Sequence, residues 1–97
     1  MGAADFMIRA KGTSAQDAFK AAVEDARHQH GHGGDTGSIA EKNRFQTVSV
    51  PPGRQPMDYA RELLERERRH FSQDRYGAAG CIELGEGEYL FFGTAPE

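Results

Sequence analysis

Residues 81–92 read CIELGEGEYLFF, two largely apolar runs on either side of a Gly-Glu-Gly turn. Short apolar runs that flank a glycine-containing turn are typical of two antiparallel strands joined tightly. The pattern therefore predicts a β-hairpin with strands at 81–84 and 88–92 and a turn at 85–87. This hairpin is the last element predicted along the chain.

Two further strands and two helices precede the hairpin. Residues 5–10 and 44–50 predict strands. One helix begins after Ser14 and ends at Gly31, and a second begins near Gln55 with Pro56 in its first turn. The order β-α-β-α-β-β predicts one α+β domain over residues 1–97, with a four-stranded sheet and two helices on one face. The apolar positions of the helices recur with a period of 3.6: Ala15, Ala18, Phe19, Ala22, Val23 and Ala26, then Met57, Ala60, Leu64 and Phe71.

The overall charge limits the kinds of partner. The chain carries 12 Lys and Arg against 15 Asp and Glu, a net charge of −3. This argues against general nucleic-acid binding and against anionic membranes, since both need a cationic surface. Of the cations, nine are Arg and three are Lys, and Arg suits bidentate recognition of phosphate or carboxylate. A local anion site is therefore compatible with the acidic composition.

The single cysteine and the absence of long apolar runs favour the cytoplasm as the compartment. No apolar run approaches the roughly 18 residues that span a bilayer. The opening MGAAD lacks the basic and apolar regions of a secretory signal. Cys81 is the single cysteine, and its apolar flank is typical of a small buried side chain rather than a nucleophile. We therefore expect a cytoplasmic protein with no membrane partner.

The glycine-rich segment at residues 31–37, GHGGDTG, is the first candidate site. Glycines let backbone N–H groups converge on a ligand, a short helix starting near Ser38 would point its N-terminus there, and nearby cations would neutralise phosphate. The alternative is a tight connection without a ligand. The segment is not a Walker loop, because it follows a helix and lacks Gly-Lys-Ser/Thr. The predicted ligand-binding residues are Gly33, Gly34, Thr36, Gly37, Ser38, Lys42, Arg44 and Arg54.

Three histidines, His28, His30 and His32, form a candidate zinc site together with Asp35. Imidazoles two residues apart chelate zinc when the backbone is extended or turning, whereas on a helix they diverge. Convergence therefore requires that the last helical turn unwinds. The alternative is a set of histidines that interact with the helix dipole. Glu41 with His32 and Asp35 is a weaker candidate for acid–base chemistry, against the alternative of solvated surface charge.

Two segments are candidate interaction surfaces. Alternation along 88–92 leaves Phe91 or its neighbours facing outward, where an aromatic ring stacks on a base or lies in a dimer interface. The alternative is a sheet covered on both faces. Because so short a chain has a small core, we expect a homo-oligomer. The helix at 61–70 carries mixed charges, which favour an ion-paired solvent face over nucleic-acid binding.

Residues 31–42 (GHGGDTGSIAEK), with YGAAGC at 76–81 and YLFFG at 89–93, resemble a family of short, mostly uncharacterised phage and actinobacterial proteins. The resemblance covers most of the chain and centres on the loop Gly-His-Gly-Gly-x-Thr-Gly-x-Ile-Ala-Glu-Lys. It brings no established activity. By analogy with other small phage proteins, it implies sequestration of a nucleotide signal of antiviral defence in the host cytoplasm. Asp35 stands where the resemblance leads us to expect an aromatic residue, which puts a stacking role there in doubt.

Three functional hypotheses follow. The leading one is a non-enzymatic, oligomeric protein that sequesters a phosphate-bearing nucleotide at the glycine-rich loop. The second is a metal-dependent hydrolase or nuclease that uses the histidine cluster and zinc. The third is a protein-interaction domain without a small-molecule ligand. The first hypothesis predicts that Arg44→Ala removes much of the ligand affinity without unfolding the protein.

Overall fold

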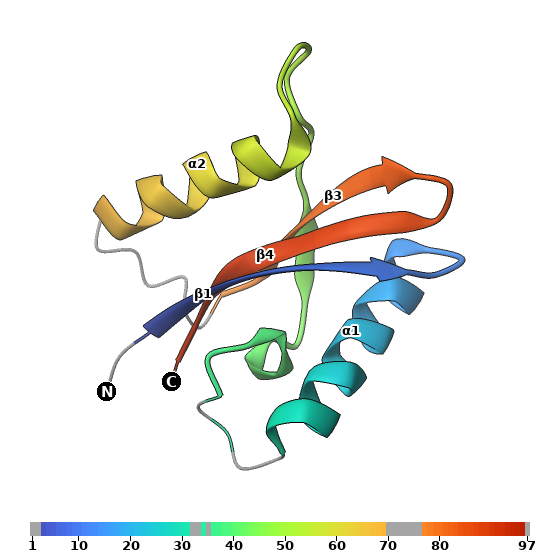
Figure 1. Cartoon of the computed structure of the whole chain (residues 1–97), viewed down its shortest axis with the longest axis vertical. Helices are drawn as coiled ribbons and strands as arrows, with labels where there is room; N and C mark the ends of the chain where they lie inside the picture. Colours follow the sequence, from blue (N-terminus) through green and yellow to red (C-terminus); the bar gives the residue numbers. More distant parts are fainter. Residues whose placement is uncertain (1–2, 32–33, 35, 70–76, 97) are drawn as a thin grey trace.

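The computed structural model describes residues 3–31, 34, 36–69 and 77–96. Along this part of the chain the elements are β1 (Ala3–Lys11), α1 (Ala15–His30), the 3₁₀ turn η1 (Ile39–Glu41), β2 (Phe45–Thr47), α2 (Pro56–Arg69), β3 (Ala79–Gly85) and β4 (Glu88–Pro96) (Figure 1). The predicted α+β class and the order of strands and helices are confirmed. No helix in the described ranges has the length and apolarity needed to cross a membrane.

The four strands form one mixed sheet in the order β1-β4-β3-β2. The hairpin strands β3 and β4 pair antiparallel at its centre, β1 pairs antiparallel with β4, and β2 pairs parallel with β3. The hairpin is therefore the core of the sheet, and β1 and β2 are its edges.

The two helices lie on opposite faces of this sheet. One apolar cluster joins α1 to Cys81 and Phe91, and the other joins α2 to Ile82 and Phe92. Successive residues of a strand point to opposite faces, so the sheet separates the helices, as Figure 1 shows. The prediction of both helices on one face is therefore wrong.

The strand order explains this correction. The connection from β1 to β2 crosses the whole sheet, whereas the connection from β2 to β3 moves back by one strand. Right-handed crossovers between parallel strands are the strong rule. Two right-handed crossovers that move in opposite directions across a sheet place their helices on opposite faces.

Helix α1 begins and ends where the sequence predicts. The Ser14 side chain accepts a hydrogen bond from the Asp17 backbone N–H, and Gly31 ends the helix with a φ of 85°. That positive φ favours glycine. The helical stripe packs closely on the sheet because most of its side chains are small; the buried members are Ala18, Phe19, Ala22, Val23 and Ala26.

The sequence predicted the hairpin turn correctly, but it did not predict the burial of the strand that follows. Glu86 and Gly87 have φ values of 55° and 77°, as in a two-residue type I′ turn. Phe91, in contrast, is 0% exposed. The expectation of an outward-facing Phe91 is wrong, because α1 covers one face of β4 and α2 covers the other. The alternative of a sheet covered on both faces is what the structure has.

Strand β2 is shorter than the predicted 44–50. Its ladder with β3 covers Phe45–Thr47, and one more hydrogen bond, from the Val48 N–H to the Cys81 carbonyl at 2.8 Å, extends the pairing. Pro51 follows soon after and has no N–H to donate. Phe71, which was predicted on the buried side of α2, lies outside the described residues.

Candidate functional site

The described part of the glycine-rich segment forms a closed turn held by its own side chains. The Thr36 hydroxyl donates to the Glu41 carboxylate at 2.9 Å, and the Thr36 backbone N–H reaches the same Oε2 at 3.3 Å. The hydroxyls of Thr36 and Ser38 lie 2.7 Å apart, and Ser38 Oγ accepts from the Ala40 N–H at 3.2 Å. Ser38 thus caps η1, as predicted.

These contacts change the interpretation of the loop as a phosphate site. The Gly37 N–H donates to the Pro96 carbonyl at 2.7 Å, and the Glu41 carboxylate already takes the donors of Thr36. An anionic ligand would have to displace that carboxylate. Gly33, His32 and Asp35 lie outside the described residues, so the loop is assessed here through Gly34, Thr36, Gly37 and Ser38.

A small hollow does lie beside this loop. Its volume is about 190 Å³, and its described lining includes Arg27, Gly31, Gly34 and Glu41. Ligand pockets have volumes of about 300–1,000 Å³. The hollow is therefore small for a nucleotide, and Glu41 contributes negative charge to it.

Lys42 is buried rather than presented to solvent. Its side chain is 3% exposed, and Nζ donates to the Gly77 carbonyl at 3.0 Å. The neighbouring Gly93 lies against the Phe6 ring, because a Cβ there would lie 3.1 Å from Phe6 Cζ. This lysine therefore ties the end of η1 to the segment that leads into β3.

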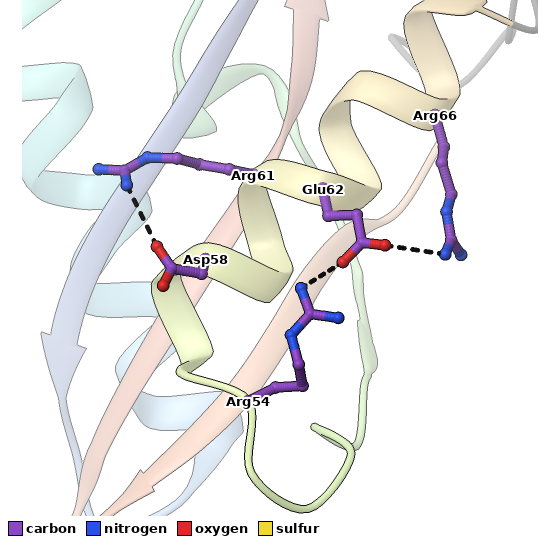
Figure 2. Close-up of polar contacts among 5 residues, drawn as sticks. All are labelled: Arg54, Asp58, Arg61, Glu62 and Arg66. Carbon is purple, nitrogen blue, oxygen red and sulfur yellow. Dashed lines mark hydrogen bonds and ion pairs between the residues drawn. The ribbon is translucent and has the colours of Figure 1, made fainter.

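Arg54 lies with α2, apart from the glycine-rich loop. Its guanidinium pairs with Glu62 and lies 5.5 Å from the centre of the Tyr59 ring. Glu62 also accepts from Arg66 at 3.1 Å, so one carboxylate bridges two arginines, as Figure 2 shows. The hydrogen bond from Arg54 is the main cause that lowers the pKa of Glu62 below its usual value. The ion pairing predicted for this helix is confirmed at Glu62 and Arg66.

Arg44, unlike Arg54, lies beside a groove between α2 and the sheet. A groove of about 570 Å³ opens between the carboxyl-terminal half of α2 and the sheet. Gln46 lines it from β2, and Arg44 lines it from the position just before β2. Leu63 and Arg66 line it from α2. Strand β4 contributes Phe92 and Thr94 to the same groove. Arginine, amide and hydroxyl groups thus surround apolar walls.

Gly80 shapes the floor of this groove. A Cβ at Gly80 would lie 2.3 Å from the Phe92 ring, so the absence of a side chain lets the ring pack directly on the backbone of β3. Phe92 is 5% exposed and belongs to the α2 cluster. The floor is therefore well packed, and the groove lies above it rather than cutting through it.

The described residues of the predicted site are thus divided among four places. Gly34, Thr36, Gly37 and Ser38 form the loop turn, Lys42 is buried against the Gly77 carbonyl, Arg44 lines the groove, and Arg54 pairs with α2. The sequence analysis assigned Arg66 to an ion-paired solvent face and missed its place on the groove. The predicted order β2-α2-β3 could have indicated that Arg66 lies near Arg44, because such a unit brings the end of α2 back over the start of β2.

The described histidines do not converge. His28 and His30 are exposed in the last turn of α1, which is helical through His30. Side chains two apart on a helix diverge, and His32 lies outside the described residues. Among the residues that the structure describes, no group of three or more His, Cys, Asp or Glu is placed to hold a metal ion. The zinc site stays a prediction.

Cys81 is buried, as expected. It is 1% exposed, and burial together with the charge of Glu83 raises the pKa of its thiol to about 11. The nucleophilic form of cysteine is the thiolate. The thiol is therefore neutral and shielded at physiological pH.

Comparison of the chain with protein-family models, with curated proteins and with solved structures found no match. The resemblance to phage and actinobacterial proteins stays a prediction.

Proposed function

We propose that this protein is a non-enzymatic binder that captures a phosphate-bearing nucleotide in the groove between α2 and the sheet. The proposal keeps the class of ligand predicted from the sequence and moves its site from the glycine-rich loop to Arg44. If a phage encodes the chain, such capture would lower the free concentration of a nucleotide signal of host defence.

The composition of the groove supports this class of ligand. Its volume of about 570 Å³ falls within the range of about 300–1,000 Å³ that small-molecule sites occupy. Leu63, Val48 and Phe92 offer apolar surface for a base or sugar. Arg44 and Arg66 offer guanidinium groups, which match the geometry of phosphate oxygens.

The single observation that carries the proposal is the position of Arg44. Arg54 and Arg66 are both engaged by Glu62. Arg44 is exposed at the groove, and none of the ion pairs found among the described residues involves it. Its backbone is fixed, because the Arg44 carbonyl accepts from the Ala79 N–H at 3.0 Å. An exposed guanidinium on a fixed backbone beside a groove is suited to contact phosphate.

Isothermal titration calorimetry of the full chain with a panel of nucleoside monophosphates, cyclic dinucleotides and ADP-ribose tests the proposal. We expect at least one member of the panel to bind with one site per chain. Arg44→Ala removes a hydrogen bond to a charged group, worth about 1.5–3 kcal/mol, and so weakens binding by roughly 10- to 100-fold.

Two matched variants separate the groove from the other arginines and from the loop. Arg61→Ala removes an exposed arginine of α2 that pairs with Asp58 at 3.5 Å and does not line the groove, so affinity should be unchanged. Thr36→Val removes the hydroxyl contacts to Glu41 and Ser38 in the loop without touching the groove. Loss of affinity in Thr36→Val with retention in Arg44→Ala would return the site to the loop. No binding of any panel member by the wild-type chain would count against the proposal as a whole.

A further inference from the structure

Strand β1 forms a long edge of the sheet, and no other described strand pairs with its outer side. It extends over Ala3–Lys11, and its partner in the sheet is β4. In Figure 1 β1 lies in front of β4, and neither α1 nor α2 crosses in front of it. A long edge strand of this kind presents a row of unpaired N–H and C=O groups, which is a template for another strand.

The hydrogen-bond pattern fixes which residues of β1 face this edge. In the β1–β4 register, Lys11 lies opposite Glu88, so Gly12 is next to the end of the ladder and opposite Gly87. The Gly12 N–H donates to the Gly87 carbonyl at 2.9 Å. Hydrogen-bonded pairs alternate along an antiparallel ladder. The even-numbered residues of β1 therefore bond to β4, and the N–H and C=O groups of the odd-numbered residues point outward.

We propose that β1 pairs antiparallel with β1 of a second copy of this chain, with Met7 on the two-fold axis. Met7 is the central residue of Ala3–Lys11, so this register pairs the whole strand with its copy. Met7 lies opposite itself in a hydrogen-bonded pair. The result is a continuous eight-stranded sheet with a symmetric interface.

Charge complementarity selects this register. With Met7 on the axis, Asp5 of each copy lies opposite Arg9 of the other, which gives two cross-strand ion pairs. Registers centred on Phe6 or Ile8 use the same outward groups, but they place Met7 opposite Asp5 or Arg9. Asp5 lies in the edge strand and accepts a hydrogen bond from Thr94 of β4 at 3.0 Å. Arg9 is exposed and contacts Met57 Sδ at 3.7 Å, which uses one of its five N–H donors.

The apolar residues of the same strand support a second copy as the occupant. Phe6 and Ile8 are half-buried against the α1 cluster. In the proposed register each Phe6 lies beside Ile8 of the other copy. The second copy therefore covers the exposed parts of these two side chains. A hollow of about 260 Å³, lined in part by Ile8, Ala21 and Asp25, lies along this edge between β1 and α1. The second copy would close it.

Sedimentation velocity of the full chain over a wide range of concentration tests this proposal, and we expect a monomer–dimer equilibrium. Arg9→Asp turns both ion pairs into like-charge pairs. Inversion of two cross-strand pairs should raise the dissociation constant about 30-fold. Asp5→Arg should do the same. Far-UV circular dichroism confirms that each variant is folded.

Mixing the two variants tests the register itself. In a heterodimer of Arg9→Asp with Asp5→Arg, every position 5 lies opposite a position 9 of opposite charge, so dimers should return on mixing. A wild-type chain that stays monomeric at every concentration would overturn the proposal. So would an Arg9→Asp variant that dimerises like the wild type, or a folded mixture that stays monomeric.

A backbone variant keeps the test decisive if Asp5→Arg fails to fold. Arg9→Pro removes an N–H that points outward, and proline is tolerated at such a position of an edge strand. We expect a folded monomer. Ala10→Pro removes an N–H that bonds to β4 and should unfold the protein. A folded Arg9→Pro variant that dimerises as tightly as the wild type would refute pairing through this edge.

Discussion

Replacing Phe91 with alanine tests whether the sheet is covered on both faces. Phe91 lies in the middle of β4 and is 0% exposed. Its ring packs against Phe19 at 5.5 Å and Phe45 at 5.8 Å between centroids, both in edge-to-face arrangements. Tyr89 stacks on it from the same strand at 6.5 Å. Truncation leaves a cavity between α1 and the sheet that these rings cannot fill without moving.

The expected loss is large for a chain of this length. Phe→Ala at a fully buried position costs about 3–5 kcal/mol. A chain of 97 residues has a free energy of unfolding of about 5–15 kcal/mol. The melting temperature of a domain of this size falls by roughly 4–8 °C for each kcal/mol. We therefore expect Phe91→Ala to melt more than about 12 °C below the wild type.

Urea unfolding followed by circular dichroism measures the change, with Tyr89→Ala as the matched control. Tyr89 lies on the same face of the same strand but is half-buried, so its truncation should cost less than about 2 kcal/mol. If Phe91→Ala lost no more than Tyr89→Ala, the ring would not be in a closed core. An aromatic residue that faces solvent or a partner would then have to be reconsidered.

Two further predictions concern Cys81 and the hairpin turn. The Cys81 thiol ionises near 9.0 when unfolded and near 11 when folded, so the unfolded state binds fewer protons in this window. The free energy of unfolding should therefore fall by about 1.4 kcal/mol per pH unit between pH 9 and pH 11, and urea titrations should show that Cys81→Ala removes this slope. Glu86 has a φ of 55°, which Asn adopts more readily than Glu because its short side chain hydrogen-bonds locally, so Glu86→Asn should raise the free energy of unfolding by about 1 kcal/mol. Gly87→Ala, at a φ of 77°, should lower it in the same urea assay.

Local sequence signals predicted the elements of this fold well. Ser14 and Gly31 mark the ends of α1 because capping depends on a few neighbouring residues. The Gly-Glu-Gly turn marks the hairpin for the same reason. The placement of α2 depended instead on the order of strands in the sheet, which arises from pairing between residues far apart in the chain. Because β2 pairs with β3 at the far edge from β1, the two crossovers run in opposite directions.

The candidate site was harder to predict, because cationic residues that are close in sequence lie in different environments. Lys42 and Arg44 are two residues apart, yet Lys42 is 3% exposed and bonded to the Gly77 carbonyl, whereas Arg44 lines the groove. Nothing in the local pattern distinguishes a buried lysine from an exposed arginine. Glu41 likewise turned from a candidate acid–base residue into the acceptor that closes the glycine-rich turn.

The positions of the groove and of the β1 edge make binding and self-association separable. Arg44 and Gln46 line the groove beside β2, and the described residues of β1 do not contribute to it. In the sheet order β1-β4-β3-β2, a dimer through β1 places the two β2 strands at the outer ends of the joined sheet. Each copy then keeps its groove open, so the dimer should bind two ligands independently. Arg44→Ala should weaken binding without changing the dimer, and Arg9→Asp should dissociate the dimer without changing the affinity of each groove.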